Sequence, residues 1–321
     1  MKARAKRTLK TLLPIIVGVF LIAYSYYSTS ADDRVRIFRY IREADLFWVS
    51  VSVGIGFLSH LSRAIRWNYL LEPLGYRPRI RNNLLMVLMA YFANLGIPRS
   101  GEVLRATALA TYEKVPFQKG FGTIVTERVI DVIMLLLIIL AALLSQTAII
   151  GRYLSENGVG LGGSILMVGV GIGGMFLALA VLRSSNHPLA LKARGFIRGL
   201  LDGVLSIFRM KRKWAFLGHT LFIWGCYIGM FWVIKFTVAE TISLSFGELL
   251  VAFVAGAFAM STTNGGIGLY PIAVSKALAL FGISAVAGDA FGWIMWIAQT
   301  LMVVGFGAIS FLLLPLWNRD R

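Results

Sequence analysis

The apolar positions of this chain fall into long runs that are separated by short polar segments. A helix of about 18 or more apolar residues crosses the ~30 Å hydrocarbon layer of a bilayer. Several runs reach that length. The pattern predicts about six transmembrane helices, near residues 11–27, 46–61, 121–145, 161–182, 214–236 and 290–314. We therefore expect an all-α polytopic membrane protein.

Two other apolar regions are too short to cross. Residues 84–97 would form a helix of only about 22 Å, and the pattern breaks there at Asn94, Gly96 and Pro98. Residues 249–260 and 269–281 flank a second break, STTNGGIG. Irregular backbone at membrane depth is tolerated where it is buried in protein or lines a cavity. The sequence therefore predicts two re-entrant helical hairpins beside the six spans.

The basic residues are distributed unevenly between the two sides of this topology. With the N-terminus inside and both hairpins re-entrant, the inner segments hold 24 basic and five acidic residues, and the outer segments six basic and eight acidic. Basic residues concentrate in cytoplasmic loops, so we expect a cell (inner) membrane protein with both termini cytoplasmic. The basic start resembles a signal peptide, but its long apolar run and the following spans favour an uncleaved span.

Three polar regions have amphipathic or interfacial character. Apolar positions at helical spacing predict a short interfacial helix over residues 32–45, and Trp67 and Tyr69 are placed in the interfacial belt. Residues 183–213 carry eight basic residues and one acid with an apolar stripe. This loop lies on the membrane surface or is an ordinary positive-inside loop, and the sequence leaves both interpretations open.

The second hairpin is expected to enter from the side opposite the first. AYFA at residues 90–93 resembles GAFA at residues 256–259, and each precedes its break by a few residues. Such a pattern indicates an inverted repeat, with halves at about 46–145 and 214–315 and a site where the broken helices meet. Coincidence between helices of small residues is the alternative.

Composition excludes a sizeable soluble domain. The chain is 58% hydrophobic and 15% charged, with mean hydropathy +0.76, whereas soluble domains carry about 25% charged residues. We expect one integral membrane domain over residues 1–321. The +17 charge lies in loops and indicates anionic lipid rather than nucleic acid. The lone cysteine, Cys226, and the scattered histidines predict no disulfide, metal or cofactor.

Charged and glycine-rich positions beside the breaks are the candidate site, since ionisable residues in the membrane are costly unless functional. Arg99 and Arg105 suit a phosphate, and Glu102 between them neutralises an arginine or contacts a cationic headgroup. Glu127 and Asp131 share a helix face beside Arg128, as a structural ion-pair network or a substrate-facing cluster. The complete candidate set is Arg63, Arg66, Asn94, Arg99, Gly101, Glu102, Arg105, Glu127, Arg128, Asp131, Asn264, Gly265, Gly266, Gly268 and Lys276.

The second break has its own chemistry. Glycines at a helix N-terminus allow a phosphate close to free backbone N–H groups, although a tight turn also needs them. Asn264, Gly265, Gly266 and Gly268 precede the helix that is expected from Leu269. Lys276 contacts the substrate or extends to the outer interface.

Four motifs together resemble one family. RxxRW at residues 63–67, NxxxPxxGExxR at 94–105, ERxxD at 127–131 and GGIG at 265–268 are similar to the lysylphosphatidylglycerol synthase transmembrane-region family, the flippase-like or YbhN-like group. The resemblance covers nearly the whole chain. It implies a domain that flips an aminoacylated phospholipid, fused in the best-understood members to a soluble synthase domain. No such domain is visible here, so we do not expect synthase activity.

The headgroup is where this sequence departs from the family. Many relatives have Glu a few residues after the glycine motif, and Pro271 occupies that position here. This favours a plain anionic lipid or polyprenyl phosphate over a cationic headgroup. We expect a flippase for a phospholipid or polyprenyl-linked lipid, with no enzyme activity. A membrane transferase acting on a lipid-linked donor, with Glu127 and Asp131 as base or metal ligands, and a non-transporting scaffold are the alternatives; an oligomer remains open.

Overall fold

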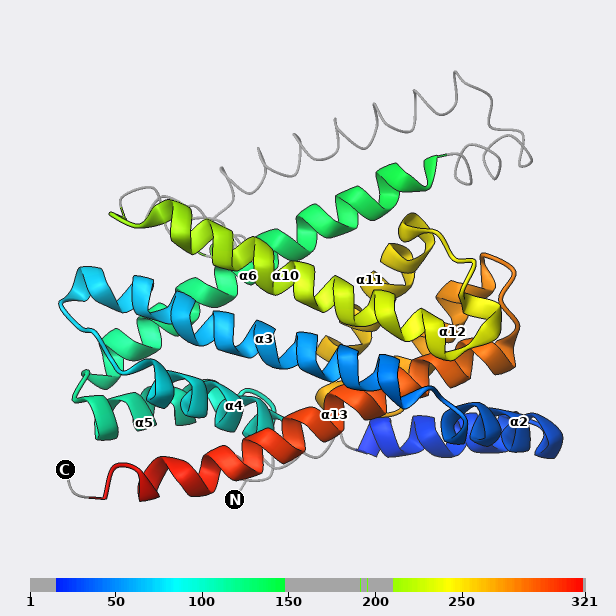
Figure 1. Ribbon diagram of the computed structural model, residues 1–321, viewed down its shortest axis with the longest axis horizontal. Helices are drawn as coiled ribbons and strands as arrows, with labels where there is room; N and C mark the ends of the chain where they lie inside the picture. The colour runs from blue at the N-terminus through cyan, green and yellow to red at the C-terminus, as the bar shows by residue number, and fades with distance from the viewer. Residues whose placement is uncertain (1–15, 148–190, 192–194, 196–209, 320–321) are drawn as a thin grey trace. The chain divides into compact units, whose positions relative to one another are not determined.

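The computed structural model describes residues 16–147, 191, 195 and 210–319, and the described chain is built from helices (Figure 1). The expected span at 161–182 and nearly all of the loop at 183–213 lie outside these residues. The described helices are Ile16–Ser28, α2 Ala31–Arg42, α3 Leu46–Leu71, η1 Glu72–Leu74, α4 Ile80–Gly96, α5 Ser100–Glu113, α6 Phe117–Ser145, α10 Lys213–Ile234, η2 Lys235–Thr237, η3 Ala239–Thr241, α11 Phe246–Thr262, η4 Asn264–Gly266, α12 Leu269–Ala279 and α13 Ala285–Leu316.

The chain forms two compact units. The larger unit comprises Met1–Glu127 and Arg212–Arg321, and the smaller unit is Arg128–Lys211. Helix α6 begins in the larger unit and continues into the smaller one.

Three described helices are long and apolar enough to cross a membrane: α6, Lys213–Thr237 (α10 with η2) and α13. A fourth candidate is the pair of α2 and α3, which is bent by 69° at a short break. Asp45 sets that break, because its carboxylate caps α3 by accepting a hydrogen bond from the Phe47 N–H at 2.8 Å. A separate amphipathic helix before α3 agrees with the interfacial helix expected at 32–45. The number of six spans stays a prediction.

The first hairpin consists of α4 and α5. Helix α4 starts four residues earlier than expected and ends at Gly96, where Ile97 takes an extended conformation before Pro98. Its 17 residues extend about 25 Å, less than the bilayer core. Glu113 at the end of α5 accepts hydrogen bonds from Arg79 and Asn82 at the start of α4, at 3.0 and 2.6 Å. The two helices therefore return to the same end.

The second hairpin consists of α11 and α12. Gly256 of α11 faces the Tyr270 ring of α12, so the two helices pack closely. The Ser284 N–H, just after α12, donates to Glu240, just before α11, at 3.3 Å. This hairpin therefore opens beside the N-terminus of α13.

The two hairpins open at opposite ends of α13. Arg79, at the open end of the first hairpin, donates to Asn318 beyond the C-terminus of α13, at 2.6 Å. The open end of the second hairpin lies beside Ser284, the N-cap of the same helix. The two helix pairs thus open at opposite ends of one helix, and their entry from opposite sides of a membrane stays a prediction.

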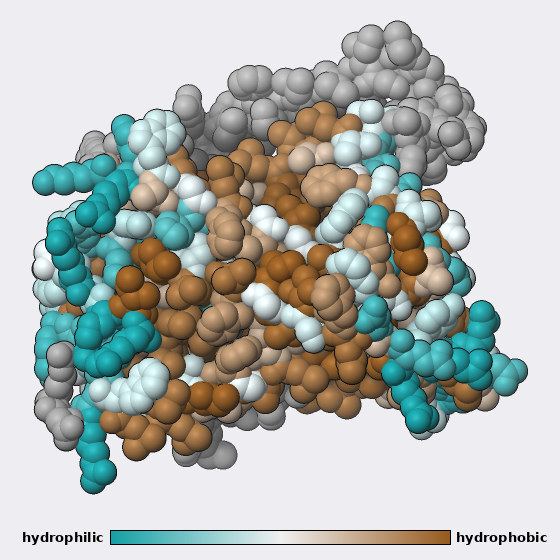
Figure 2. All heavy atoms as spheres, in the orientation of Figure 1, coloured by the Kyte–Doolittle hydropathy of each residue, from teal (hydrophilic) through white to brown (hydrophobic). Residues whose placement is uncertain are grey.

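Helices α3 and α10 pair antiparallel through the larger unit. Ser52 of α3 donates to the Met230 carbonyl at 3.2 Å, and Arg66 donates to Thr220 at 3.0 Å. The apolar core joins α10 to α11, α12 and α13, for example through Phe231 and Phe291, whose ring centroids are 4.9 Å apart. Over this unit, Figure 2 shows hydrophobic side chains in a band between two hydrophilic ends. This is the surface that a membrane protein requires.

Candidate functional site

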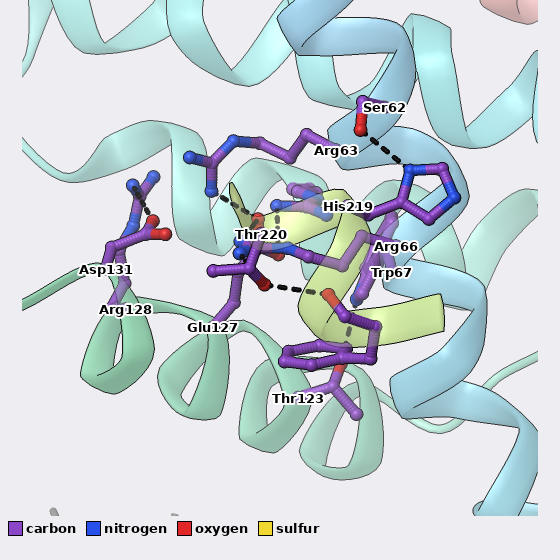
Figure 3. A network of polar contacts seen from close by, with 12 residues as sticks. Ser62, Arg63, Arg66, Trp67, Thr123, Glu127, Arg128, Asp131, His219 and Thr220 are labelled. Atoms are coloured by element: carbon purple, nitrogen blue, oxygen red, sulfur yellow. Dashed lines mark hydrogen bonds and ion pairs between the residues drawn. The ribbon is translucent and has the colours of Figure 1, made fainter. Parts of the chain in front are cut away.

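A buried cluster of charges lies inside the larger unit, with Glu127 at its centre (Figure 3). Three guanidinium groups contact its carboxylate. Arg63 forms an ion pair with Oε1, Arg66 lies 3.1 Å from the same oxygen, and Arg105 lies 3.0 Å from Oε2. All four side chains are at most 3% exposed. A buried ion cluster is tolerated only with good geometry and hydrogen bonds, so this site is tightly specified.

Three separate helices bring these charges to one depth. Arg63 lies eight residues before the end of α3, and Arg105 lies eight before the end of α5. Glu127 lies ten residues after the start of α6. At 1.5 Å per residue these positions are about 12 to 15 Å from the respective helix ends. The sequence predicted each residue as a candidate, and the structure brings them together.

Trp67 supports the cluster, and its predicted place in the interfacial belt is wrong. The ring is fully buried, its Nε1–H donates to Thr123 at 2.9 Å, and the Arg105 guanidinium lies 3.7 Å from the ring centroid. Arg105 therefore gains a cation–π contact as well as its carboxylate partner. A Trp beside RxxR suited an interface because its ring is amphipathic, but the arginine of α5 keeps it inside.

Two tyrosines extend the cluster away from Glu127, and no sequence pattern indicated them. Arg63 donates to the Tyr227 hydroxyl at 3.2 Å, and the hydroxyls of Tyr227 and Tyr91 are 3.4 Å apart. The Tyr91 ring in turn lies 4.5 Å from the His60 ring. A buried tyrosine needs a partner for its hydroxyl, but nothing in the spacing of residues so far apart indicates which one.

In the smaller unit, Arg128 and Asp131 form their own pair at 3.5 Å, one turn apart on α6. Glu127 and Asp131 were expected to share a helix face. Glu127 contacts the three arginines of the larger unit, and Asp131 contacts Arg128.

The tips of the two hairpins meet at Asn264. Its amide Nδ2 donates to the carbonyls of Leu95 and Gly96 at 2.5 and 3.2 Å. These carbonyls are at the C-terminal end of α4, where the helix leaves them without intrahelical partners. On the first tip, Asn94 Oδ1 accepts from the Gly101 N–H at 2.8 Å. Asn264 thus provides hydrogen bonds for the C-terminal carbonyls of α4, and Asn94 provides one for the N-terminus of α5.

Gly101 is required at this tip, because an added Cβ would collide with the Ala90 carbonyl and lie 2.9 Å from Asn94 Oδ1. We expect Gly101→Ala to lower stability by ~1–3 kcal/mol, the usual cost of overpacking. Gly122→Ala is the control, since nothing lies within 4 Å of its added Cβ. Thermal unfolding in detergent measures both. Equal midpoints for the two variants would contradict the tight packing of the tip.

The glycine turn of the second hairpin is covered by the first helix. Gly265, Gly266 and Gly268 all have positive φ, between 61° and 75°, which favours glycine. A Cβ on Gly268 would collide with the Gly18 carbonyl and lie 3.0 Å from the Ile22 nitrogen. Helix Ile16–Ser28 therefore lies against Gly268 at the N-terminus of α12, where we expected a phosphate, and the phosphate contact stays a prediction.

Arg99, Glu102 and Lys276 are the remaining candidates. Arg99 is exposed at the first tip, with φ 63° immediately before α5, and Glu102 is half-buried in the first turn of that helix. Lys276 is exposed in the last turn of α12, towards the open end of its hairpin. That position fits an extension to the interface. Which of these residues contact a substrate remains a prediction.

Comparisons with known proteins identify related membrane proteins. The model of the family described as the lysylphosphatidylglycerol synthase TM region matches residues 11–314. The UPF0104 membrane protein PH1989 of Pyrococcus horikoshii is 23% identical over 306 residues, which are 86% of this chain and 88% of that protein. The UPF0104 membrane protein MJ1595 of Methanocaldococcus jannaschii is 31% identical over 136 residues, 40% of this chain and 38% of that protein.

A third relative has a different kind of name. Glycosyltransferase AglD of Haloferax volcanii is 26% identical over 121 residues, which are 37% of this chain and only 19% of that protein. In the matches to MJ1595 and AglD the chain thus spans well under half of the relative's length. No solved structure matches.

Proposed function

The chain belongs to the lysylphosphatidylglycerol synthase TM-region family, and we propose that it is a lipid flippase. It moves a phosphate-bearing phospholipid or lipid-linked substrate across the cytoplasmic membrane. The observation that carries the proposal is the buried cluster of Arg63, Arg66 and Arg105 around Glu127. Ionisable groups at membrane depth mark substrate pathways by default.

The cluster suits a phosphate because a carboxylate already occupies it. Guanidinium binds carboxylate and phosphate oxygens with the same two-pronged geometry. A lipid phosphate can therefore take over contacts that Arg105 and its neighbours make with Glu127, so that one anion replaces another. This exchange avoids leaving the buried arginines without an anion at any stage, which would be costly. Arg99, exposed at the tip, is the first arginine that the headgroup meets.

Movement requires the hairpin tips to separate. The hairpins open at opposite ends of α13 and meet through Asn264. In inverted-repeat transporters the two repeats rock about a site between broken helices. We propose that breaking the contact of Asn264 with Leu95 and Gly96 opens the path past the cluster. The chain lacks a GxxxxGK[ST] nucleotide motif, so transport uses a gradient or is passive scrambling.

Charge reversal at Arg99 tests this path. Arg99→Glu is expected to abolish translocation of headgroup-labelled phospholipid in proteoliposomes and to leave the fold intact, because the side chain is exposed. Arg319→Glu is the matched control, since Arg319 is exposed beyond the end of α13, and it should transport at the wild-type rate. Unchanged transport by Arg99→Glu would remove this residue from the site.

The match to glycosyltransferase AglD favours one alternative, a membrane-embedded transferase acting on a lipid-linked donor. Glu127 and Asp131 would then act as base or metal ligands. Each of them contacts arginine, so each carboxylate already has a cationic partner in this conformation. Metal-dependent turnover of a lipid-linked sugar donor by the purified protein would support the transferase and displace the flippase.

A further inference from the structure

A groove runs between α3 and α10 on the surface of the larger unit. It has a volume of about 490 Å³, within the ~300–1,000 Å³ of ligand pockets. Its apolar wall consists of Leu58, Leu61 and Ile65 from α3 and of Ala215, Gly218 and Phe222 from α10. An added Cβ on Gly218 would meet nothing within 4 Å, so the absence of a side chain there keeps the groove open.

The wall follows one face of each helix, because its positions recur every three or four residues. Leu58 and Phe222 are 46% and 50% exposed. Helix α10 is long and apolar enough to cross a membrane, and α3 pairs with it antiparallel. The medium around this groove is therefore the hydrocarbon of the bilayer, and an extended acyl chain is the ligand that fits such a wall.

One end of the groove leads to a charged patch. Glu72, the C-cap of α3, lies seven residues beyond Ile65, and it pairs with Arg212 at 3.8 Å and with Arg77 at 2.7 Å. The two arginine side chains are 61% and 78% exposed, and Lys213 follows Arg212. Two arginines thus pair with Glu72, and Lys213 adds a further cation next to one of them in the sequence. The surplus of positive charge suits the phosphate of a lipid whose chain enters the groove.

A polar pair interrupts the apolar wall of the groove. Ser62 Oγ and His219 Nδ1 are 2.8 Å apart, and both residues line the groove (Figure 3). When Ser62 donates to Nδ1, the His219 Nε2 carries the ring proton and can donate to another acceptor. His219 is seven residues from Arg212, about 10 Å along the helix. An ester carbonyl of a lipid held at Arg212 is an acceptor at that depth.

We propose that the groove between α3 and α10 binds one acyl chain of an anionic phospholipid, with the lipid phosphate at Arg212 and Lys213 and an ester carbonyl at His219. The acyl chain of the lipid would lie against the apolar wall. The ester would contact the polar pair, and the phosphate would contact the basic patch. The site lies on the surface of the helix pair, whereas the arginine cluster is buried.

Native mass spectrometry of the detergent-purified protein tests this, with palmitoyl-oleoyl phosphatidylglycerol and phosphatidylcholine as probes. Wild type should retain phosphatidylglycerol preferentially. Gly218→Leu fills the groove and should lower that affinity about tenfold. Gly225→Leu, on the same helix with equally open space but outside the groove, should bind like wild type. Ala215→Leu fills the groove from the next turn and serves if Gly218→Leu does not fold.

The basic patch is tested separately. The double substitution Arg212→Gln and Lys213→Gln should lower the affinity for phosphatidylglycerol about fivefold for each basic residue removed, which is the contribution of one basic residue near an anionic surface. Phosphatidylcholine binding should change little. Equal lipid retention by the folded groove-filling variants and by Gly225→Leu would overturn the proposal. Equal retention of both lipids by wild type would overturn the phosphate assignment.

Discussion

Replacing Glu127 with alanine is expected to destabilise the protein more than any other single substitution at the candidate site. The carboxylate is shared by Arg63, Arg66 and Arg105, all buried. Removing one partner from a buried ion cluster costs ~3–5 kcal/mol, because the remaining charges stay out of water. Arg77→Ala breaks an exposed pair with Glu72 and is expected to cost ~1 kcal/mol or less. Thermal unfolding in detergent compares the two.

A double-mutant cycle separates this effect from lost packing. Arg105→Met and Glu127→Met replace two contacting groups with apolar side chains, and the double variant should be markedly more stable than the sum of the single losses predicts. Additive losses would mean that Arg105 and Glu127 do not interact. If the Glu127→Ala variant were as stable as Arg77→Ala, that result would contradict the buried cluster itself.

Fixing the hairpin tips together is expected to stop transport completely. Asn264 Nδ2 lies 3.2 Å from the Gly96 carbonyl, so cysteines at positions 96 and 264 are close enough for a short thiol-specific cross-linker. The only native cysteine, Cys226, is replaced with serine first. If the tips must part for a lipid to pass, the cross-linked protein cannot move it, and a reducible cross-linker should restore transport on reduction.

The single-cysteine variants are the matched controls for the cross-link. Each receives the same reagent at one of the two positions without forming a bridge, so any loss common to them comes from modification alone. Gly96→Cys is mild, since nothing lies within 4 Å of an added Cβ there. Transport at the single-variant rate by fully cross-linked protein would show that the tips stay together during the cycle.

Helix length made the hairpins predictable from the sequence. The apolar pieces around Pro98 and Asn264 were too short to cross a bilayer, and the charge asymmetry placed them on opposite sides. Both helix pairs are present and open at opposite ends of α13, and their re-entrance into a membrane stays a prediction. Helix ends were less certain, as α4 extends four residues further towards its N-terminus than the apolar pattern. Asn82 and Asn83 belong to this extension, and both are buried because they form hydrogen bonds to other polar side chains.

The partners within the site were not predictable. Arg99 and Arg105 were considered together because they are near in sequence, but Arg105 contacts Glu127 and Trp67, while Arg99 is exposed before the helix begins. Arg66 and Arg63 are 61 and 64 positions from Glu127, and periodicity within one helix contains no information on such pairs. The cover of helix Ile16–Ser28 over Gly268 was hidden for the same reason.

The most direct test of the proposed function is whether the purified wild-type protein moves lipid. Proteoliposomes carrying fluorescent phospholipids with anionic or zwitterionic headgroups are treated with a membrane-impermeant quencher, and the protected fraction is followed over time. Lipid flipping by this protein predicts that one headgroup class becomes accessible faster than in protein-free vesicles. Folded protein that accelerates no headgroup class, including an added polyprenyl phosphate lipid, would contradict it.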